Sequence, residues 1–391
     1  MKFVDIVDTT RKALAQTLGT EYMEQLPDLA EIDSYKLVDI GHAVAQSERG
    51  VDAFVKAIST IRGKLVIETC GASNEFKQML IDSFEWGSYV EVGLCEMGQI
   101  QDSDIWNLVD GQTVDDNVFW QPKVRSKIFE EAKAIMCPYS ISEEAAMMSF
   151  NSWSEMGKLI GGIEASQRET LETAIDVYAH ALASCGAAIS VNGTETAVHL
   201  ITEATAAGIC ESTIKPEEFL NNDACITFML KRIYETKARM MGLPNAAFNN
   251  HQVPVRSRNV NLALLLNAVS SAKFDVKANT YNDEEIGIGE FDVISAWQGI
   301  IDDNKIFDYN TVSTIKIAAD ANNKLGLGTA AVTVENVVGL AYDKRALVVC
   351  PFKQKTTGHY NGRGDFNNIY LHMLLNMSLN NDFPIVAFVL D

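Results

Sequence analysis

The sequence has few basic residues for its acidity. Lys and Arg number 32 against 52 Asp and Glu, which gives a net charge of −20. Proteins that read nucleic acids need clustered Lys and Arg to contact phosphates. Such clusters occur here only locally, within 231–239 and 344–355. The charge balance therefore argues against a nucleic-acid reader.

Paired cysteines and a targeting segment are also missing. The seven cysteines are scattered, odd in number and without a Cys-x-x-Cys pair, so we expect neither a disulfide framework nor a zinc site. Asp5 and Asp8 lie where a signal peptide needs an uncharged apolar core. No apolar run reaches the length of a membrane span. The sequence predicts a soluble protein of a reducing compartment, with no membrane partner.

No motif of a known catalytic or cofactor site survives inspection. The sequence contains no Walker-type Gly-Lys-Ser/Thr, no His-Glu-x-x-His and no Gly-x-Ser-x-Gly, and its six histidines are dispersed. Gly326–Ala331 matches Gly-x-Gly-x-x-Ala, but a valine-rich run follows instead of the helix that a dinucleotide site needs, so we interpret it as a glycine turn. Cys350 lies in an apolar run, which favours an inert thiol over a pair with His359. We predict no catalytic, cofactor-binding or metal-binding residues.

The apolar fraction of 47% allows a substantial core, in one elaborate domain or two to three ordinary ones. The most regular feature of the sequence is an amphipathic pattern over about 152–188. Ser152 and Glu155 have the spacing of a capping box, and Glu164 and Arg168 form an i,i+4 pair on the polar face. The apolar face carries Trp153, Met156, Ile160, Ile163, Leu171, Ala174, Ile175, Tyr178, Leu182 and Cys185. These positions predict one long spine helix, with a bend or a close backbone contact at Gly157, Gly161 and Gly162.

A long β-hairpin is expected before the spine. Strand-like runs at 87–94 and 124–135 flank 96–123, which contains several aspartates and no base before Lys123. The aspartates suggest calcium or magnesium, but Trp106 stands where a calcium loop needs a third oxygen ligand, so a solvated tip is the better interpretation. Such a hairpin cannot bury both faces within its own domain, and we expect it to lie on another surface.

Shorter elements are expected on both sides of the spine. Helical spacing occurs at 5–18, 34–46, 50–61, 74–84, 198–207 and 216–241, and the spacing of Ser140 and Glu143 predicts a short helix start. Strand-like runs occur at 64–69, 260–266, 291–297, 312–318, 332–340, 347–352 and 385–390, and 366–379 is mixed. No internal repeat marks a domain boundary.

Several short motifs carry a resemblance to a known family. Gly111-Gln112-Thr113-Val114-Asp115 followed by Lys123–Phe129 resembles the hairpin of tailed-bacteriophage major capsid proteins with the Hong Kong 97 fold. The closing stretches Ala341–Leu347, Thr356-Thr357-x-x-Tyr360-Asn361 and Val386–Phe388 are similar to that family as well. Each motif is loose, but they occur in family order across roughly 60–391.

The resemblance implies an α+β fold of the Hong Kong 97 type. By this resemblance, residues 1–62 form an N-terminal arm. Residues 63–190 form a peripheral domain, with an extended loop at about 87–137 and the spine helix at about 152–188. An axial domain is expected at 191–335, with C-terminal strands at 336–391 returning to the core. No long charged helical segment of the kind that some relatives use as a built-in scaffold occurs at the front of the sequence. We therefore expect scaffolding to be a separate protein or unnecessary.

The implied function is that of a major capsid protein of a tailed phage, not of an enzyme. It would assemble with itself, as pentamers and hexamers, into an icosahedral shell around double-stranded DNA that it contacts only non-specifically. Scaffolding, portal and decoration proteins are the other partners implied, with assembly in the host cytoplasm and residence in the virion. The alternatives are the shell of an encapsulin-type nanocompartment and, in another class, a soluble cytoplasmic enzyme without a recognisable motif.

Overall fold

The computed structural model describes residues 75–80, 90–95, 124–129, 132–142, 144–145, 148, 153–192, 196–249, 251–269, 291–297, 314–319, 327–364 and 366–391. The expected helices at 5–18, 34–46 and 50–61, the run 64–69 and the acidic tip at 96–123 lie outside these residues. The chain forms two compact units, one of 1–88, 132–176 and 350–376, the other of 89–131, 177–349 and 377–391.

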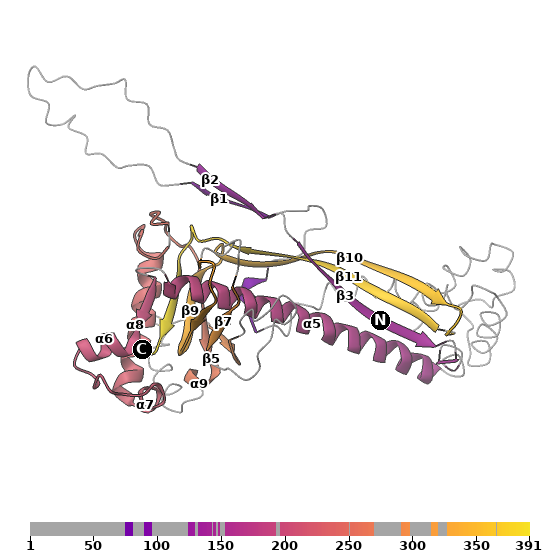
Figure 1. Cartoon of the computed structure of the whole chain (residues 1–391), viewed down its shortest axis with the longest axis horizontal. Coiled ribbons are helices and arrows are strands. Elements are labelled where there is room, and N and C mark those ends of the chain that lie inside the picture. The colour runs from indigo at the N-terminus through magenta and orange to yellow at the C-terminus, as the bar shows by residue number, and fades with distance from the viewer. Residues whose placement is uncertain are drawn as a thin grey trace, which may run out of the picture. The chain divides into compact units, whose positions relative to one another are not determined.

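The first unit contains a long three-stranded sheet and the first part of the spine helix. The strand order is β10 (Leu347–Asn361), β11 (Phe366–Leu379) and β3 (Ala132–Ser142). Strands β11 and β3 are antiparallel, with Leu371 opposite Cys137, and both of these residues are buried. Figure 1 shows helix α5 (Trp153–Asn192) running along this sheet. The 3-10 helix η3 (Lys77–Met79) belongs to the same unit, where Phe76 and Met79 are buried.

The predicted spine helix is confirmed, but its environment changes along its length. α5 has 40 residues. In the first unit Ile163 and Leu171 are buried while Glu169 is exposed, as the amphipathic pattern predicts. Beyond Asp176, the buried side chains surround the helix: Val177, Ala179, His180, Ala181, Ala183, Ser184, Cys185, Ala187, Ala188, Ile189 and Ser190. The amphipathic pattern therefore belongs to the first part of the helix, and the second part is enclosed almost all round.

The second half of α5 also meets the length and composition test for a membrane span. Ala165–Asn192 passes this test, yet 72% of its apolar window is buried inside the protein. A helix that its own protein encloses also needs apolar side chains on all sides, because its whole surface is removed from water. We therefore interpret the segment as a core helix.

Of the three glycines at which a bend or close contact was predicted, the structure describes the surroundings of Gly162 alone, and a close approach is found further along, at Gly186. A Cβ at Gly162 would meet no atom within 4 Å, whereas at Gly186 it would lie 3.2 Å from Leu347 Cδ2. The surroundings of Gly157 and Gly161, and the capping box at Ser152, lie outside the described residues.

The second unit is built on a five-stranded mixed sheet. Its strand order is β4 (Ala197–His199), β12 (Ile385–Val389), β9 (Val337–Asp343), β5 (Val260–Leu265) and β6 (Asp292–Ile294). The three central strands pair antiparallel, and the two outer strands pair parallel to their neighbours. Every residue of the three central strands is buried, which requires cover on both faces of the sheet.

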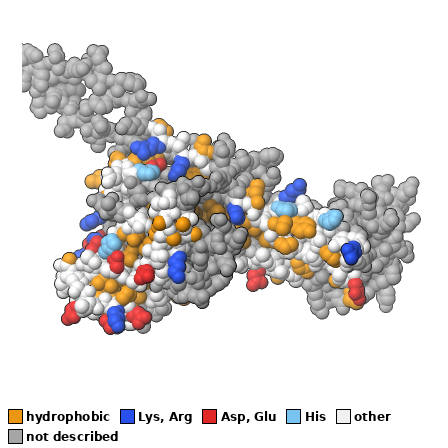
Figure 2. All heavy atoms as spheres, in the orientation of Figure 1, with side chains coloured by type: hydrophobic (Ala, Val, Ile, Leu, Met, Phe, Trp, Pro, Cys, Tyr) orange, Lys and Arg blue, Asp and Glu red, His pale blue; other side chains and the backbone are white. Residues whose placement is uncertain are grey.

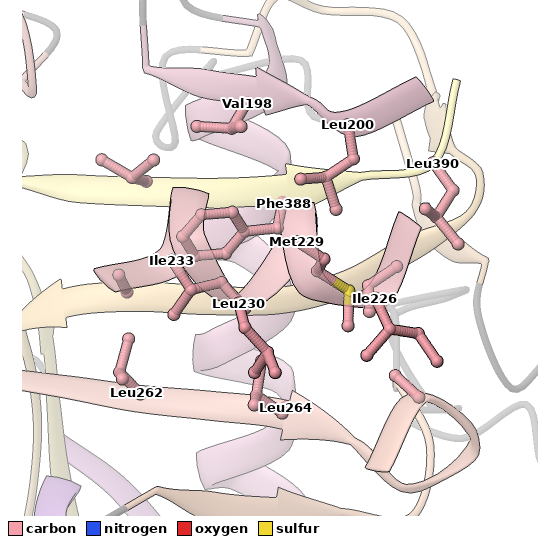
Figure 3. Packing of buried hydrophobic residues seen from close by; sticks show 14 of the residues in the cluster. Val198, Leu200, Ile226, Met229, Leu230, Ile233, Leu262, Leu264, Phe388 and Leu390 are labelled. Atoms are coloured by element: carbon pink, nitrogen blue, oxygen red, sulfur yellow. The ribbon is translucent and has the colours of Figure 1, made fainter. Parts of the chain in front are cut away.

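Helices provide this cover. On one face lie α6 (Leu200–Ala206), α7 (Pro216–Asn221) and α8 (Asp223–Met241). Figure 3 shows Met229, Leu230 and Ile233 of α8 directed at Phe388 and Leu264 of the sheet. The end of α5 lies against the other face, where a Cβ at Gly186 would lie 3.8 Å from Ile385 Cγ2 of β12, and Ser190 Oγ accepts a hydrogen bond from the Ala387 N–H at 2.8 Å. The second unit is thus a helix–sheet–helix sandwich.

Three small elements complete the described chain. Helix α9 (Leu266–Val269) follows β5 directly. Strands β7 (Ile315–Ile317) and β8 (Val332–Val334) form an antiparallel pair. Strands β1 (Val90–Cys95) and β2 (Val124–Phe129) form another.

Several predicted boundaries are wrong for local reasons. The run 124–135 is two strands, because β2 and β3 belong to different sheets. The run 332–340 is also two strands, broken near Asn336, whose φ of 56° lies in the left-handed region. Ser140 lies in β3, and it is Ser142 Oγ that accepts the Ala145 N–H, so the cap is two residues later than predicted. The predicted helix 198–207 begins as strand β4.

Burial makes the thiol of Cys185 chemically inert. Desolvation raises the pKa of Cys185 to about 12, because a thiolate there would lose its hydration. We expect no alkylation of Cys185 by iodoacetamide at pH 8 in the native protein and full alkylation in denaturant, measured by peptide mass spectrometry. Native labelling at a rate close to the denatured rate would show that the second half of α5 opens readily.

Candidate assembly surface

The β1–β2 pair forms a two-stranded ribbon, as the predicted hairpin requires. Its register places Leu94 opposite Arg125 and Gly93 opposite Ser126. An isolated two-stranded ribbon is marginally stable in water, so its stability must come from packing on another surface. The connecting residues 96–123 lie outside the described part of the chain.

The two faces of the ribbon differ in character. Alternation along β2 places Arg125 on one face and Val124, Ser126 and Ile128 on the other. Leu94, which shares the face of Arg125, is buried. On the opposite face Val124 is 68% exposed and Ile128 51% exposed. The described ribbon therefore turns one face towards its own unit and presents apolar side chains on the other.

An ion pair links the inner face of the ribbon to the rest of the second unit. Arg125 Nη1 lies 3.9 Å from Asp382 Oδ1, and the same oxygen lies 2.6 Å from His251 Nδ1. Asp382 is mostly buried, so it is screened less by solvent than a surface carboxylate. These contacts fix which face of the ribbon stays free.

No catalytic constellation is found in the described residues. Cys350 and His359 both lie on β10, nine residues apart, which corresponds to about 30 Å along a strand, so they do not form a pair. The described residues contain no group of three His, Cys, Asp or Glu side chains able to hold a metal ion. Cys137, Cys185, Cys210, Cys225 and Cys350 are free thiols. Gly328 has a φ of 96°, and strand β8 follows it, as the interpretation of a glycine turn predicts.

The sequence located the ribbon strands but missed its exposed apolar face. Val124 and Ile128 stood within a predicted strand, and nothing in their neighbours showed which face would be buried. The signal was present in the alternation of Val124, Ser126 and Ile128 with basic residues. It could be interpreted only once Arg125 was seen to contact the body of its own unit.

Comparison with protein families gives one match over most of the chain. The model of the Phi29-like phage major capsid proteins matches residues 11–389. No curated protein sequence matches the chain.

Comparison with solved structures supports the fold. The capsid structure of Staphylococcus phage Andhra matches with a TM-score of 0.51 and 12% identity, covering 81% of this chain and 84% of that chain. The structure of the head fiber and inner core protein gp22 of native bacteriophage P68 matches with a TM-score of 0.47 and 10% identity, over 81% and 84%. The capsid structure of the cyanophage P-SCSP1u gives 0.41 and 9%, over 80% and 86%. The Andhra match supports the predicted capsid fold of the Hong Kong 97 type.

Proposed function

The chain belongs to the Phi29-like phage major capsid protein family and is a structural protein of the phage shell, and we propose that this shell is a closed icosahedral head around double-stranded DNA. The observation that carries the proposal is the family match over residues 11–389. It supports neither the encapsulin alternative nor the enzyme alternative. The capsid protein assembles with itself in the virion; rings of five and six subunits are the arrangement that we propose, because identical head-to-tail contacts close into rings.

The domain assignment follows the same proposal. We assign 1–62 to an arm that reaches neighbouring subunits, about 87–137 to an extended loop and 191–335 to an axial domain around the symmetry axes. The rest of 63–190 is the peripheral domain, and the C-terminal strands at 336–391 return to the core of the peripheral and axial domains. The free apolar face of the β1–β2 ribbon supports the assignment of the loop, because Val124 and Ile128 would be covered by a neighbour.

The acidity of the chain favours only weak contact between the shell and the packaged DNA. A net charge of −20 per subunit repels phosphates, so DNA can slide and pack without adhering. We propose that assembly takes place in the host cytoplasm with portal and decoration proteins, and that scaffolding is either a separate protein or unnecessary.

Electron microscopy tests the proposed shell directly. The purified protein, alone and after co-expression with the scaffolding protein of its phage, is expected to form rings or closed shells tens of nanometres wide. A homogeneous monomer or dimer in both preparations, across varied salt concentrations, would contradict self-assembly by this chain. Tubes or flat sheets without closed particles would contradict the icosahedral form alone.

A further inference from the structure

The second unit contains a cavity of about 900 Å³ beside Gly93 and Leu94 of the ribbon. Its wall combines β1, the end of α8, the segment that precedes β5 and the turn after β9. Four basic residues line it, with one acidic residue: Arg256, Arg258, Lys344, Arg345 and Asp343. Figure 2 shows Lys and Arg side chains on the described surface close to where β1 and β2 lie in Figure 1. The cavity is thus strongly cationic in a chain of net charge −20.

The one carboxylate in the wall is already neutralised. Arg345 donates to both oxygens of Asp343, from Nε at 2.9 Å and Nη2 at 2.8 Å, and its guanidinium stacks 4.4 Å above the Phe383 ring centroid. This bidentate pair occupies the Asp343 carboxylate, so the other three basic residues have no acidic partner in the cavity wall.

Those three cations are available to a ligand. Arg256, Arg258 and Lys344 are exposed, and none of them forms an ion pair with any residue in the described ranges. The Arg256 side chain donates from Nε to the Met241 carbonyl at 3.1 Å, and the Arg256 carbonyl accepts from Arg345 Nη2 at 3.4 Å. Ser257 lines the same wall and is 1% exposed, and its hydroxyl has no hydrogen-bond partner among the described residues.

The complementary charge lies in the same chain, between the strands of the ribbon. Residues 96–122 contain no Lys or Arg and carry six carboxylates: Glu96, Asp102, Asp104, Asp110, Asp115 and Asp116. Apolar residues stand between the carboxylates, as in Ile105-Trp106, and the cavity wall offers Leu94 and Met241 to them. The middle of this segment is about 14 residues from either of its ends, and 14 fully extended residues span up to about 46 Å. That reach is comparable with the width of a domain, so the segment can extend to a second subunit.

We propose that the cationic cavity of one subunit binds the acidic segment 96–122 of a neighbouring copy, through carboxylates on Arg256, Arg258 and Lys344. This inference rests on the proposed self-assembly and names an electrostatic contact within it. Subunits of charge −20 repel one another. A contact between local charges of opposite sign offsets that repulsion and selects one orientation of the two copies.

The geometry favours an acidic peptide over DNA as the occupant. Duplex binding needs a stripe of phosphate contacts along a surface. Here the free cations converge on one cavity, and an apolar wall accompanies them. An alternating acidic and apolar segment matches both features.

Carbodiimide cross-linking tests the proposal on the unmodified protein. Shells assembled without DNA from an equal mixture of ¹⁴N- and ¹⁵N-labelled subunits are cross-linked, and the products are identified by mass spectrometry. We expect Lys344 to join carboxylates of 96–122 in mixed-isotope pairs, at least about tenfold more often than exposed lysines outside the cavity, such as Lys215 and Lys231. Pairs of a single isotope would show that each segment occupies its own subunit and would overturn the proposal.

Two further outcomes would also overturn it. Shells that form normally but give no Lys344 product with this segment would leave the proposed function intact and remove the inference. Protection of Lys344 from acetylation only when DNA is packaged would identify nucleic acid as the occupant. If the protein forms no particle at all, the proposed self-assembly fails and the inference fails with it.

Charge reversal supplies an independent test. We expect Arg258→Glu/Lys344→Glu to lower the assembled fraction about tenfold, and Asp110→Lys/Asp115→Lys in the same chain to restore it. The matched control Lys215→Glu/Lys231→Glu makes the same change in net charge outside the cavity, and we expect it to assemble normally. Thermal unfolding of the unassembled subunits checks that each variant folds. Equal loss of assembly in the control, or no rescue by the second pair, would contradict a specific contact.

Discussion

Replacing Gly339 with valine is expected to prevent the subunit from folding to a soluble form. Gly339 lies in β9, the central strand of the five-stranded sheet. A Cβ there would lie 2.5 Å from Leu264 Cδ2 and 2.9 Å from the Ala263 carbonyl oxygen, with the Phe388 ring at 3.7 Å. Both faces of the sheet are covered by helices, so neither the backbone nor Leu264 has room to move. Overpacking of this kind costs roughly 3 kcal/mol or more, a large part of the stability of a typical domain.

Expression, solubility and denaturant unfolding of the unassembled subunit check this expectation. Gly93→Val is the matched control, because Gly93 also lies in a strand but a Cβ there would meet no atom within 4 Å. We expect the control to unfold within about 0.5 kcal/mol of the wild type. A soluble Gly339→Val subunit of unchanged stability would show that the sheet can separate at β5 and β9.

Placing charge on the free face of the ribbon is expected to block shell assembly without unfolding the subunit. Val124→Glu/Ile128→Glu removes two apolar side chains that are largely exposed, so the isolated subunit loses little. In a shell a neighbouring subunit would cover the same positions. Full burial of one apolar side chain stabilises such a contact by about 1.5–3 kcal/mol. Allowing for their partial exposure in the subunit, a loss of about 3 kcal/mol per contact raises the concentration needed for assembly about 100-fold.

Sedimentation across a concentration series measures the assembly threshold, and circular dichroism measures folding. Leu243→Glu/Leu266→Glu is the matched control, with the same added charge at exposed apolar positions outside the ribbon. We expect it to assemble near the wild-type concentration. An equal rise in both thresholds would attribute the effect to added negative charge in general. An unchanged threshold for the ribbon variant would show that its apolar face stays uncovered in the shell.

The sequence predicted elements whose periodicity is set by their own residues. α5 is an example, because apolar positions three and four apart run from Leu171 to Cys185. α8 is another, since it lies within the predicted helical range 216–241 and its apolar Leu230 and Ile233, three residues apart, are fully buried. Phe228 and Tyr234 of the same helix are only partly buried and pack against this core.

Elements whose pattern depends on their neighbours were missed. β11 was interpreted as mixed because its buried positions include Asn367 and its outward positions include Tyr370 and Leu374, so alternation of polarity is not visible. Pairing with β3 identifies it as a strand, since the hydrogen-bonded ladder runs from Phe366 to Asn376. In the same way, the run 124–135 reads as one strand until its two halves join different sheets.

By itself the sequence determined the class of the protein: an acidic chain without catalytic motifs, a long spine helix, a hairpin before it and motifs in the order of a capsid family. These properties depend on composition and on spacing along the chain. Only the tertiary structure decided which face of the ribbon is free, why Gly339 and Gly186 leave no room for a side chain, and how cations from 256–258 and 344–345 converge on one cavity. Such features arise where segments distant in sequence come together, and local periodicity carries no information about those distances.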